Sequence, residues 1–210
     1  MSLIENLVVN VDDFQLNIPR WEILDDGITA LVGPSGSGKS TVFRVLLGLQ
    51  PCPTLRWVVG GIDLGTLGVS ERRLGVVFQN YELFPHLSGR GNIEFAAKAR
   101  KLSDQDTQSL LAELVQELKM ESFIDRKVKL CSGGERQRVA LARAIIGKPR
   151  VLLLDEPFSA LDEELRDEAR SLVKTIIKRY RIPTILVTHD RRDVETLADK
   201  ISEIKNGKIL

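Results

Sequence analysis

Three short segments of the chain are apolar at nearly every position. They run from Ile28 to Val32, from Val151 to Leu154 and from Thr184 to Val187, and they are rich in Val, Ile and Leu. Short runs of this kind, bounded by turn-forming residues, are typical of strands that are buried on both faces of a parallel sheet. We therefore predict three central strands at these positions.

Between these strands, hydrophobic residues recur with helical spacing. Thr41 to Leu47 predicts a helix that ends at Gly48, and residues 90–146 are mainly helical, with capping patterns at Ser103 and Ser132. Another amphipathic helix is expected from Glu163 to Tyr180, with an inward stripe of Leu165, Ala169, Leu172, Val173, Ile176 and Ile177. The alternation of strands and helices predicts an α/β fold with an inserted helical part.

The N-terminal part of the chain alternates imperfectly between apolar and polar residues. Residues 7–23 predict one or two half-buried strands, with turns at Asp12-Asp13 and at Pro19. Further strands are expected from Leu55 to Val59 and from Leu74 to Phe78. The N-terminal strands predict a β subdomain beside the mainly parallel sheet.

Length and composition narrow the class of protein. The chain has 210 residues, a formal net charge of +1 and 28% charged residues, which argues against sequence-independent nucleic-acid binding as its main role. Cys52 and Cys131 lack the spacing of a metal site and favour a reducing compartment. No segment reaches the roughly 20 apolar residues of a membrane-spanning helix. We expect a soluble chain whose membrane partners, for any membrane process, are separate polypeptides.

A phosphate-binding loop follows the first central strand. The sequence fits G-x-x-x-x-G-K-[ST], and its candidate nucleotide-binding residues are Gly33, Pro34, Ser35, Gly36, Ser37, Gly38, Lys39, Ser40 and Thr41. Glycines let the backbone N–H groups approach phosphate oxygens, and the following helix turns its positive end toward the same anion. Lys39 is expected to reach the β- and γ-phosphates, and the Ser40 hydroxyl to hold Mg²⁺.

Two adjacent carboxylates end the second central strand. Asp155 is the expected Mg²⁺ ligand, and Glu156 is the candidate that polarises the attacking water. Neighbouring residues of a strand point to opposite sides, so the two groups need not share one role.

Six motifs stand in the order that is typical of one family. They are the phosphate loop (Walker A), Gln79 after a strand, Cys131-Ser132-Gly133-Gly134-Glu135, Leu152 to Pro157 (Walker B), Ser159-Ala160-Leu161-Asp162 and His189. With them the chain resembles the nucleotide-binding subunit of an ATP-binding cassette (ABC) transporter over nearly its whole length. The resemblance implies one ABC ATPase domain over residues 1–210. Residues 1–85 and 150–210 would form a RecA-like P-loop core with the antiparallel β part, and residues 86–149 the helical signature subdomain.

The resemblance also implies a site shared by two subunits. Two copies would face head to tail, so that Ser132, Gly133, Gly134 and Glu135 of one contact the ATP held by the other. His189 would contact the γ-phosphate, Gln79 would sense Mg²⁺ and the attacking water, and Asp162 would lie at the contact between subunits. Together with Lys39 and Glu156, His189 and Gln79 are the candidate catalytic residues; Ser40, Gln79 and Asp155 are the candidate metal ligands.

Three features depart from the family pattern. Cys131 stands where Leu is common, which should alter packing, and Glu135 stands where Gln is common, so its contact with a ribose hydroxyl loses a donor. Phe14 and Trp21 are both candidates to stack on adenine, and GTP stays open as an alternative nucleotide.

As to biological role, the resemblance implies an ATPase that powers a membrane transporter. The segments 81–87 and 156–162 are most similar to bacterial solute importers, and we expect no C-terminal regulatory barrel. Expected partners are transmembrane permease subunits, a second ATPase subunit and, through the permease, an extracytoplasmic solute-binding protein, at the cytoplasmic face of the cell membrane. Alternatives are an exporter or lipid-transport subunit, or a cytosolic ABC ATPase acting on nucleic acid or ribosomes.

Overall fold

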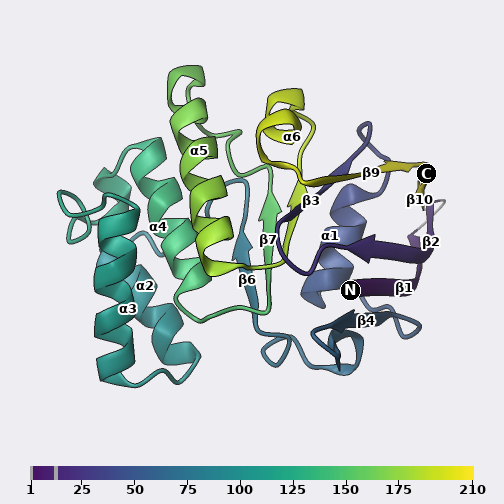
Figure 1. Ribbon diagram of the computed structural model, residues 1–210, viewed down its shortest axis with the longest axis horizontal. Coiled ribbons are helices and arrows are strands. Elements are labelled where there is room, and N and C mark those ends of the chain that lie inside the picture. Colours follow the sequence, from purple (N-terminus) through teal and green to yellow (C-terminus); the bar gives the residue numbers. More distant parts are fainter. Residues whose placement is uncertain (1, 12–13) are drawn as a thin grey trace.

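A six-stranded sheet forms the centre of the computed structural model, which describes residues 2–11 and 14–210 (Figure 1). Its strands are β3 (Ile28–Val32), β6 (Leu74–Val77), β7 (Val151–Asp155), β8 (Thr184–Val187), β9 (Lys200–Lys205) and β10 (Lys208–Ile209). They lie in the order β10-β9-β3-β8-β7-β6, and every pair is parallel except β9–β10. The carboxyl ends of β3, β6, β7 and β8 therefore meet at one edge of the sheet, where open α/β folds bind ligands.

A second sheet of four antiparallel strands lies at the end of the molecule that also carries both chain ends (Figure 1). Its strands are β1 (Ser2–Val11), β2 (Phe14–Ile23), β4 (Arg56–Val59) and β5 (Ile62–Asp63), in the order β2-β1-β4-β5. Hydrophobic residues at alternate positions of β1 and β2 face the interior, as expected for strands with one solvated face.

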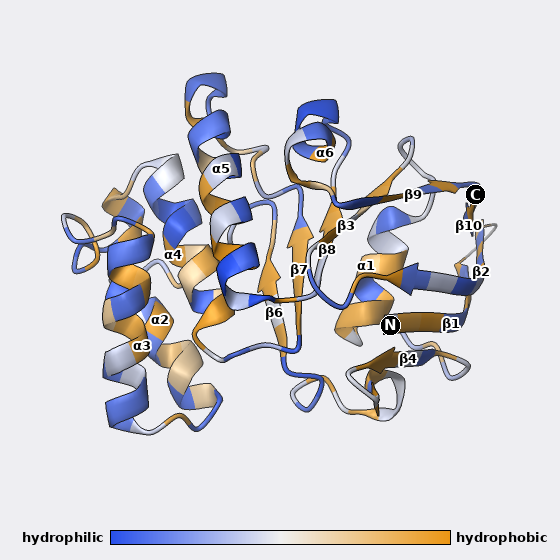
Figure 2. Ribbon diagram, viewed as in Figure 1, coloured by the Kyte–Doolittle hydropathy of each residue, from blue (hydrophilic) through white to orange (hydrophobic). Residues whose placement is uncertain are grey.

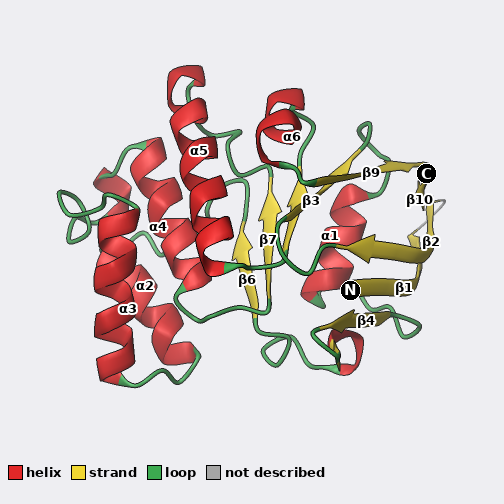
Figure 3. Ribbon diagram, in the orientation of Figure 1, coloured by secondary structure: helices red, strands yellow, loops and turns green. Residues whose placement is uncertain are grey.

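Helices fill the remaining layers (Figure 3). They are α1 (Lys39–Leu47), α2 (Gly89–Ala99), α3 (Asp104–Glu117), α4 (Gly133–Ile145), α5 (Glu163–Tyr180) and α6 (Arg191–Leu197), with short 3₁₀ turns η1 (Leu64–Thr66) and η2 (Val128–Leu130). Helices α2, α3 and α4 gather beyond β6, at the end opposite the antiparallel sheet (Figures 1 and 3). In the described residues no helix is long and apolar enough to cross a membrane.

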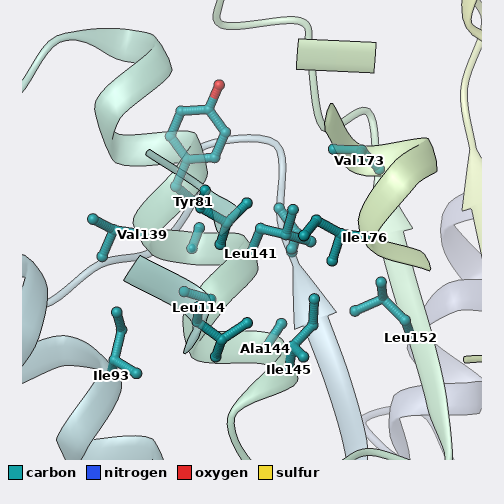
Figure 4. Packing of buried hydrophobic residues seen from close by; sticks show 14 of the residues in the cluster. Tyr81, Ile93, Leu114, Val139, Leu141, Ala144, Ile145, Leu152, Val173 and Ile176 are labelled. Atoms are coloured by element: carbon teal, nitrogen blue, oxygen red, sulfur yellow. The ribbon is translucent and has the colours of Figure 1, made fainter. Parts of the chain in front are cut away.

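The central sheet divides the hydrophobic interior into two clusters. Leu152 and Leu154 of β7 pack with residues of α2 to α5, whereas Val151 and Leu153 pack with α1 and the antiparallel sheet. The central strands are apolar along their length, and the exposed side of α5 is polar (Figure 2). Figure 4 shows the first cluster, in which Leu141 and Ile145 of α4 meet Ile176 of α5 and Leu152.

The predicted strands and helices were largely confirmed, with two errors. Pro19 lies within β2, not in a turn; the strand tolerates it because β2 is the edge strand of its sheet and needs no ladder donor there. Leu165 was expected to face inward but is 40% exposed at the start of α5. The turn expected at Asp12-Asp13 lies outside the described residues.

Candidate functional site

The phosphate loop joins the carboxyl end of β3 to the first turn of α1. Gly36 and Gly38 have φ values of +76° and +110°, which L side chains rarely adopt. The ammonium group of Lys39 donates to the backbone oxygens of Gly33 (2.8 Å) and Pro34 (2.9 Å), so it lies over the loop. The loop therefore has the backbone shape that brings N–H groups and a cation to one anion.

A large cavity opens on this loop. Its volume is about 910 Å³, and its lining consists of Val11, Phe14, Ser35, Gly36, Gly38, Lys39, Ser40, Thr41, Glu156 and His189. The predicted phosphate-binding residues from Ser35 to Thr41, except the buried Ser37, therefore line the same cavity as Glu156 and His189. Glu156 follows β7, and His189 follows β8.

Glu156 and His189 contact each other at the edge of this cavity. The His189 Nδ1 atom lies 2.8 Å from Glu156 Oε1. Glu156 follows β7 with a φ of +45°, and its N–H donates to Val187 O (2.9 Å), which anchors it to the end of β8. A non-glycine residue in this region of φ is uncommon and is held there by such contacts. Both residues were predicted as candidate catalytic residues, but their hydrogen bond was not predicted.

Asp155 ends β7 beside the same group of charges. Burial raises the pKa of its carboxyl group, the Glu156 carboxylate raises it further, and the Lys39 ammonium opposes both effects. Asp155, Glu156 and Lys39 are therefore close enough to influence one another. A cation placed beside Asp155 would favour its charged form and so oppose the rise in its pKa.

The turn between β9 and β10 supports the loop from behind. The N–H of Gly207 donates to Ser37 O (3.0 Å), and its carbonyl accepts from Asn17 N (2.8 Å) in β2. Gly207 has a φ of +74°, and a Cβ added there would lie 2.1 Å from Gln15 O. A glycine is thus required where the end of the central sheet touches both the phosphate loop and β2. The contacts of this turn were not predicted from the sequence.

The two adenine-stacking candidates have different environments. Trp21 is only 3% exposed, and its Nε1 donates to Ser202 Oγ (2.9 Å), so it is a core residue and the expectation that it could stack on a base was wrong. Phe14 lines the cavity, and its ring packs against Gly38, where an added Cβ would lie 2.9 Å from Cζ. Of the two, only Phe14 lines the cavity.

Residues 132–135 lie away from the cavity, at the start of α4. Ser132 Oγ accepts from Glu135 N, and the Glu135 carboxylate accepts from Ser132 N (2.7 Å), which forms the predicted capping box. The Glu135 carboxylate also pairs with Arg126 at 3.2 Å. None of these four residues is among those that line the cavity. Cys131 is buried and packs with the helical cluster, as expected for a small apolar residue.

Gln79 is exposed in a turn two residues beyond β6, and it too is not among the cavity-lining residues. The following segment has a strained backbone: Tyr81 and Glu82 have φ values of +62° and +44°. The Arg143 guanidinium donates to the carbonyl oxygens of both residues, each at 2.7 Å, and so ties this segment to α4.

Comparison with known proteins shows that this chain is similar to ATP-binding subunits of transporters. The sequence profile of a family described as ABC transporter matches residues 16–159. A probable sulfate/thiosulfate import ATP-binding protein (CysA) of Chlorella vulgaris is 41% identical over 209 residues, which cover 99% of this chain and 89% of the relative. An sn-glycerol-3-phosphate import ATP-binding protein (UgpC) of Roseobacter denitrificans is 41% identical over 187 residues, covering 89% of this chain.

The chain spans 52% of the length of the Roseobacter protein and 59% of that of a Synechocystis CysA relative. A solved dimeric structure of the ATP-binding cassette MJ0796, in a post-hydrolysis state bound to ADP and phosphate, superposes with a TM-score of 0.80 at 25% identity. The superposition covers 100% of this chain and 96% of the solved chain.

Proposed function

The chain belongs to the ABC transporter family, and from this premise we propose that it is the subunit that binds and hydrolyses ATP to power a bacterial-type solute importer. The single observation that carries the proposal is the shared cavity, in which Lys39 and the phosphate loop face Glu156 and His189. This arrangement supplies a phosphate cradle, a cation and a general base in one place. The names of the relatives indicate small anionic solutes, but the solute itself is selected outside this chain.

In the proposed reaction, Lys39 leaves its carbonyl partners and binds the β- and γ-phosphates. Glu156 accepts a proton from the attacking water, and His189, hydrogen-bonded to Glu156, contacts the γ-phosphate. Positioning and charge compensation are the main contributions that a protein makes to phosphoryl transfer. Phe14 is proposed to stack on the base, which favours a nucleoside triphosphate without selecting strongly between ATP and GTP.

Mg²⁺ fits the residues at the loop. Ser40 offers a hydroxyl in the first turn of α1, and Asp155 offers a carboxylate whose pKa is raised by burial and by the neighbouring Glu156. Magnesium is usually held by one or two carboxylates together with nucleotide phosphates, so it does not need a dedicated cluster of protein ligands. No cluster of three or more metal-binding His, Cys, Asp or Glu side chains occurs in residues 2–11 and 14–210. We propose Ser40 and Asp155 as ligands, with Gln79 joining them in the closed state; bound Mg²⁺ would neutralise charge on the phosphates.

We propose that the complete site needs two subunits facing head to tail. The start of α4 offers N–H groups at Gly133 and Gly134 beside the Ser132 hydroxyl, which suits a phosphate. Space around Gly134 supports this, since the nearest atom to an added Cβ is Leu165 Cδ1 at 4.0 Å, and Leu165 is itself exposed. In this arrangement Ser132 to Glu135 of one subunit cover the ATP held by the other, and Asp162 lies at their contact.

We propose that the permease docks between the core (residues 1–85 and 150–210) and the helical part (86–149). A groove of about 420 Å³ lies there, lined by apolar residues that include Phe84 and the half-exposed Phe95, whose rings are 4.7 Å apart. Docking would hold the chain at the cytoplasmic face of the membrane, with any solute-binding protein on the other side. Phe95→Asp should abolish co-purification with the permease and keep ATP binding; an unchanged complex would contradict this assignment.

The central test is Glu156→Gln. ATP should still bind, because the loop is intact, whereas the steady-state rate of phosphate release should fall at least about a hundredfold, in the range of general-base contributions. Thr175→Ala, which removes a surface hydroxyl of α5 bonded only to Ser171 O, is the matched control and should keep the wild-type rate. A Glu156→Gln rate near that of the wild type would sink the assignment.

The shared site has a separate test. Lys39→Ala and Ser132→Arg subunits, each inactive alone, should regain activity when mixed, because one site of the mixed dimer combines an intact loop with an intact residue 132. Hydrolysis that is not restored in a mixture with proven exchange of subunits would contradict the two-subunit site.

A further inference from the structure

A buried arginine connects three segments around the proposed site. The Arg170 side chain, on α5, is fully buried, yet the cavity lining does not include it. Its Nε donates to Asp193 Oδ1 (2.7 Å), Nη1 to Asp167 Oδ1 (2.8 Å) and Nη2 to Asp190 Oδ2 (3.0 Å). One guanidinium thus serves three carboxylates in a fixed planar geometry that a lysine could not reproduce.

Two of these carboxylates, Asp190 and Asp193, connect Arg170 to the residues on either side of His189. Asp190 follows it directly, and its N–H donates to Thr188 Oγ1 (3.1 Å). Thr188 precedes His189, is buried, and donates its hydroxyl proton to Asp193 Oδ2 (2.7 Å). Arg170 therefore holds both chain neighbours of His189, one directly and one through Asp193.

The same guanidinium also contacts the segment after Glu156. It lies 5.9 Å from the ring centroid of Phe158, which is 1% exposed and two residues beyond the proposed base. This distance and the burial of both groups favour a cation–π contact. Arg170 therefore touches the segments that carry each member of the Glu156–His189 pair.

The network continues to the loop between β7 and α5. Arg166, one turn before Arg170, donates from Nε to Leu161 O (3.0 Å), and its Nη1 lies 3.8 Å from Asp190 Oδ2. Leu161 is next to Asp162, which we place at the contact between subunits. A movement of residues 159–162 would therefore be transmitted through Arg166 to Asp190.

We propose that Arg170 is a positioning residue for ATP hydrolysis, which fixes Thr188 and Asp190 so that the His189 imidazole stays against Glu156, and which links this contact to residues 159–162. The inference rests on the proposed function. Its physical basis is that the imidazole is exposed and has no other hydrogen-bonding partner in the described structure to orient it. Its direction must then come from its backbone, and Arg170 is the group that fixes that backbone from both sides.

The carboxylates around Arg170 stabilise its charged form. Burial alone would lower the pKa of the Arg170 guanidinium, and its hydrogen bonds to Asp193 and Asp167, with the negative charge of the carboxylates, more than compensate, so that its pKa is raised. Removal of the cation would leave the buried Asp193 carboxylate uncompensated and would endanger folding. Arg170→Lys, which keeps the charge, and Thr188→Val, which keeps the shape, are therefore the variants of choice.

The chain contains only two histidines, His86 and His189, so the NMR resonances of both imidazoles can be assigned and followed. In Arg170→Lys and in Thr188→Val, the ring-nitrogen resonances of His189 should shift toward those of Glu156→Gln, which lacks the carboxylate. His86 serves as the internal reference. In the Glu156→Gln background, Arg170→Lys should cause little further shift, because the contact is already altered.

The kinetic counterpart is a fall in kcat with an unchanged Kd for ATP. We expect a loss of about tenfold for each variant, which corresponds to about 1.4 kcal/mol in the barrier. Arg72→Lys is the matched control, because Arg72 is also a buried arginine but donates to Val45 O and Leu46 O at the far end of α1. Arg72→Lys should change neither the His189 resonances nor kcat.

Wild-type His189 resonances in folded Arg170→Lys and Thr188→Val would overturn the inference even if kcat fell, since Arg170 would then act on stability alone. Shifted resonances with wild-type kcat would overturn it as well. A failure of the proposed function is distinguishable, because it would appear as a near wild-type rate in Glu156→Gln with no change to Arg170.

Discussion

Gly207→Ala tests whether the β9–β10 turn holds the phosphate loop in place. The added methyl group would meet the backbone oxygen of Gln15, and a residue with a side chain would have to adopt a φ of +74°. The left-handed conformation costs about 1–2 kcal/mol. Moving the turn away from β2 would in addition weaken the hydrogen bonds of Gly207 with Ser37 O and Asn17 N, each worth about 0.5–1.5 kcal/mol.

The expected loss of unfolding free energy is therefore about 2–5 kcal/mol, from the sum of these terms. Gly61→Ala provides the matched control, because Gly61 has a φ of +81° but no atom within 4 Å of an added Cβ. It should show only the conformational part, about 1–2 kcal/mol. Urea unfolding at equilibrium measures both, provided that the dependence on denaturant is the same for the two variants.

ATP binding gives the second readout for this pair of variants. Because the Gly207 N–H is bonded to Ser37 O, Gly207→Ala should weaken ATP binding severalfold, whereas Gly61→Ala in the β4–β5 turn should not. Equal losses of stability in the two variants, together with equal ATP affinity, would refute the idea that the turn supports the loop.

Three further predictions concern single side chains. Tyr81→Phe should stabilise the protein by about 1–3 kcal/mol at neutral pH, since the buried hydroxyl has no hydrogen-bond partner among the residues that the structure describes. Burial raises the pKa of Tyr81 from 10.0 to about 12, so the wild type should lose stability relative to Tyr81→Phe as pH rises through this window. A difference in unfolding free energy between the two proteins that stays constant from pH 9 to 12, measured by urea unfolding, would contradict this. Glu135→Gln keeps an acceptor for Ser132 N but loses the ion pair with Arg126. This loss should cost up to about 1 kcal/mol, so we expect the melting point to shift by no more than about 4 °C. ATPase activity should be kept, and an inactive variant would show that the charge of Glu135 is required. Phe14→Ala should raise the KM for ATP severalfold with kcat kept, and an unchanged KM would remove Phe14 from the base-binding site.

Apolar runs and motif spacing were sufficient to predict the central strands, the phosphate loop after the first and the two carboxylates at the end of the second. The bounds of α5 and the capping box at Ser132 also follow from local patterns. Such features depend on neighbours in sequence, and a single chain carries that information directly.

Contacts between distant segments could not be predicted in this way. The hydrogen bond between Glu156 and His189 joins residues 33 positions apart, and it depends on how two loops leave neighbouring strands. Pro19 looked like a turn because its tolerance depends on β2 being an edge strand, which is a property of the whole sheet. Trp21 could be assigned to the core only once Ser202, 181 residues away, was placed beside it.

The apolar character of both faces of β7 has a consequence for how the strand finds its place. Where one face of a strand is polar, a shift by one residue is opposed because every side chain would change sides. Residues 151–154 give no such protection, since all four are hydrophobic and both sides are core. Asp155 and Glu156 limit the shift instead, because sliding them into the sheet would bury their charges. The two carboxylates proposed for ATP hydrolysis thus also help to fix the register of β7 between β6 and β8. The same residues therefore act in assembly of the sheet during folding and in the chemistry of the folded protein.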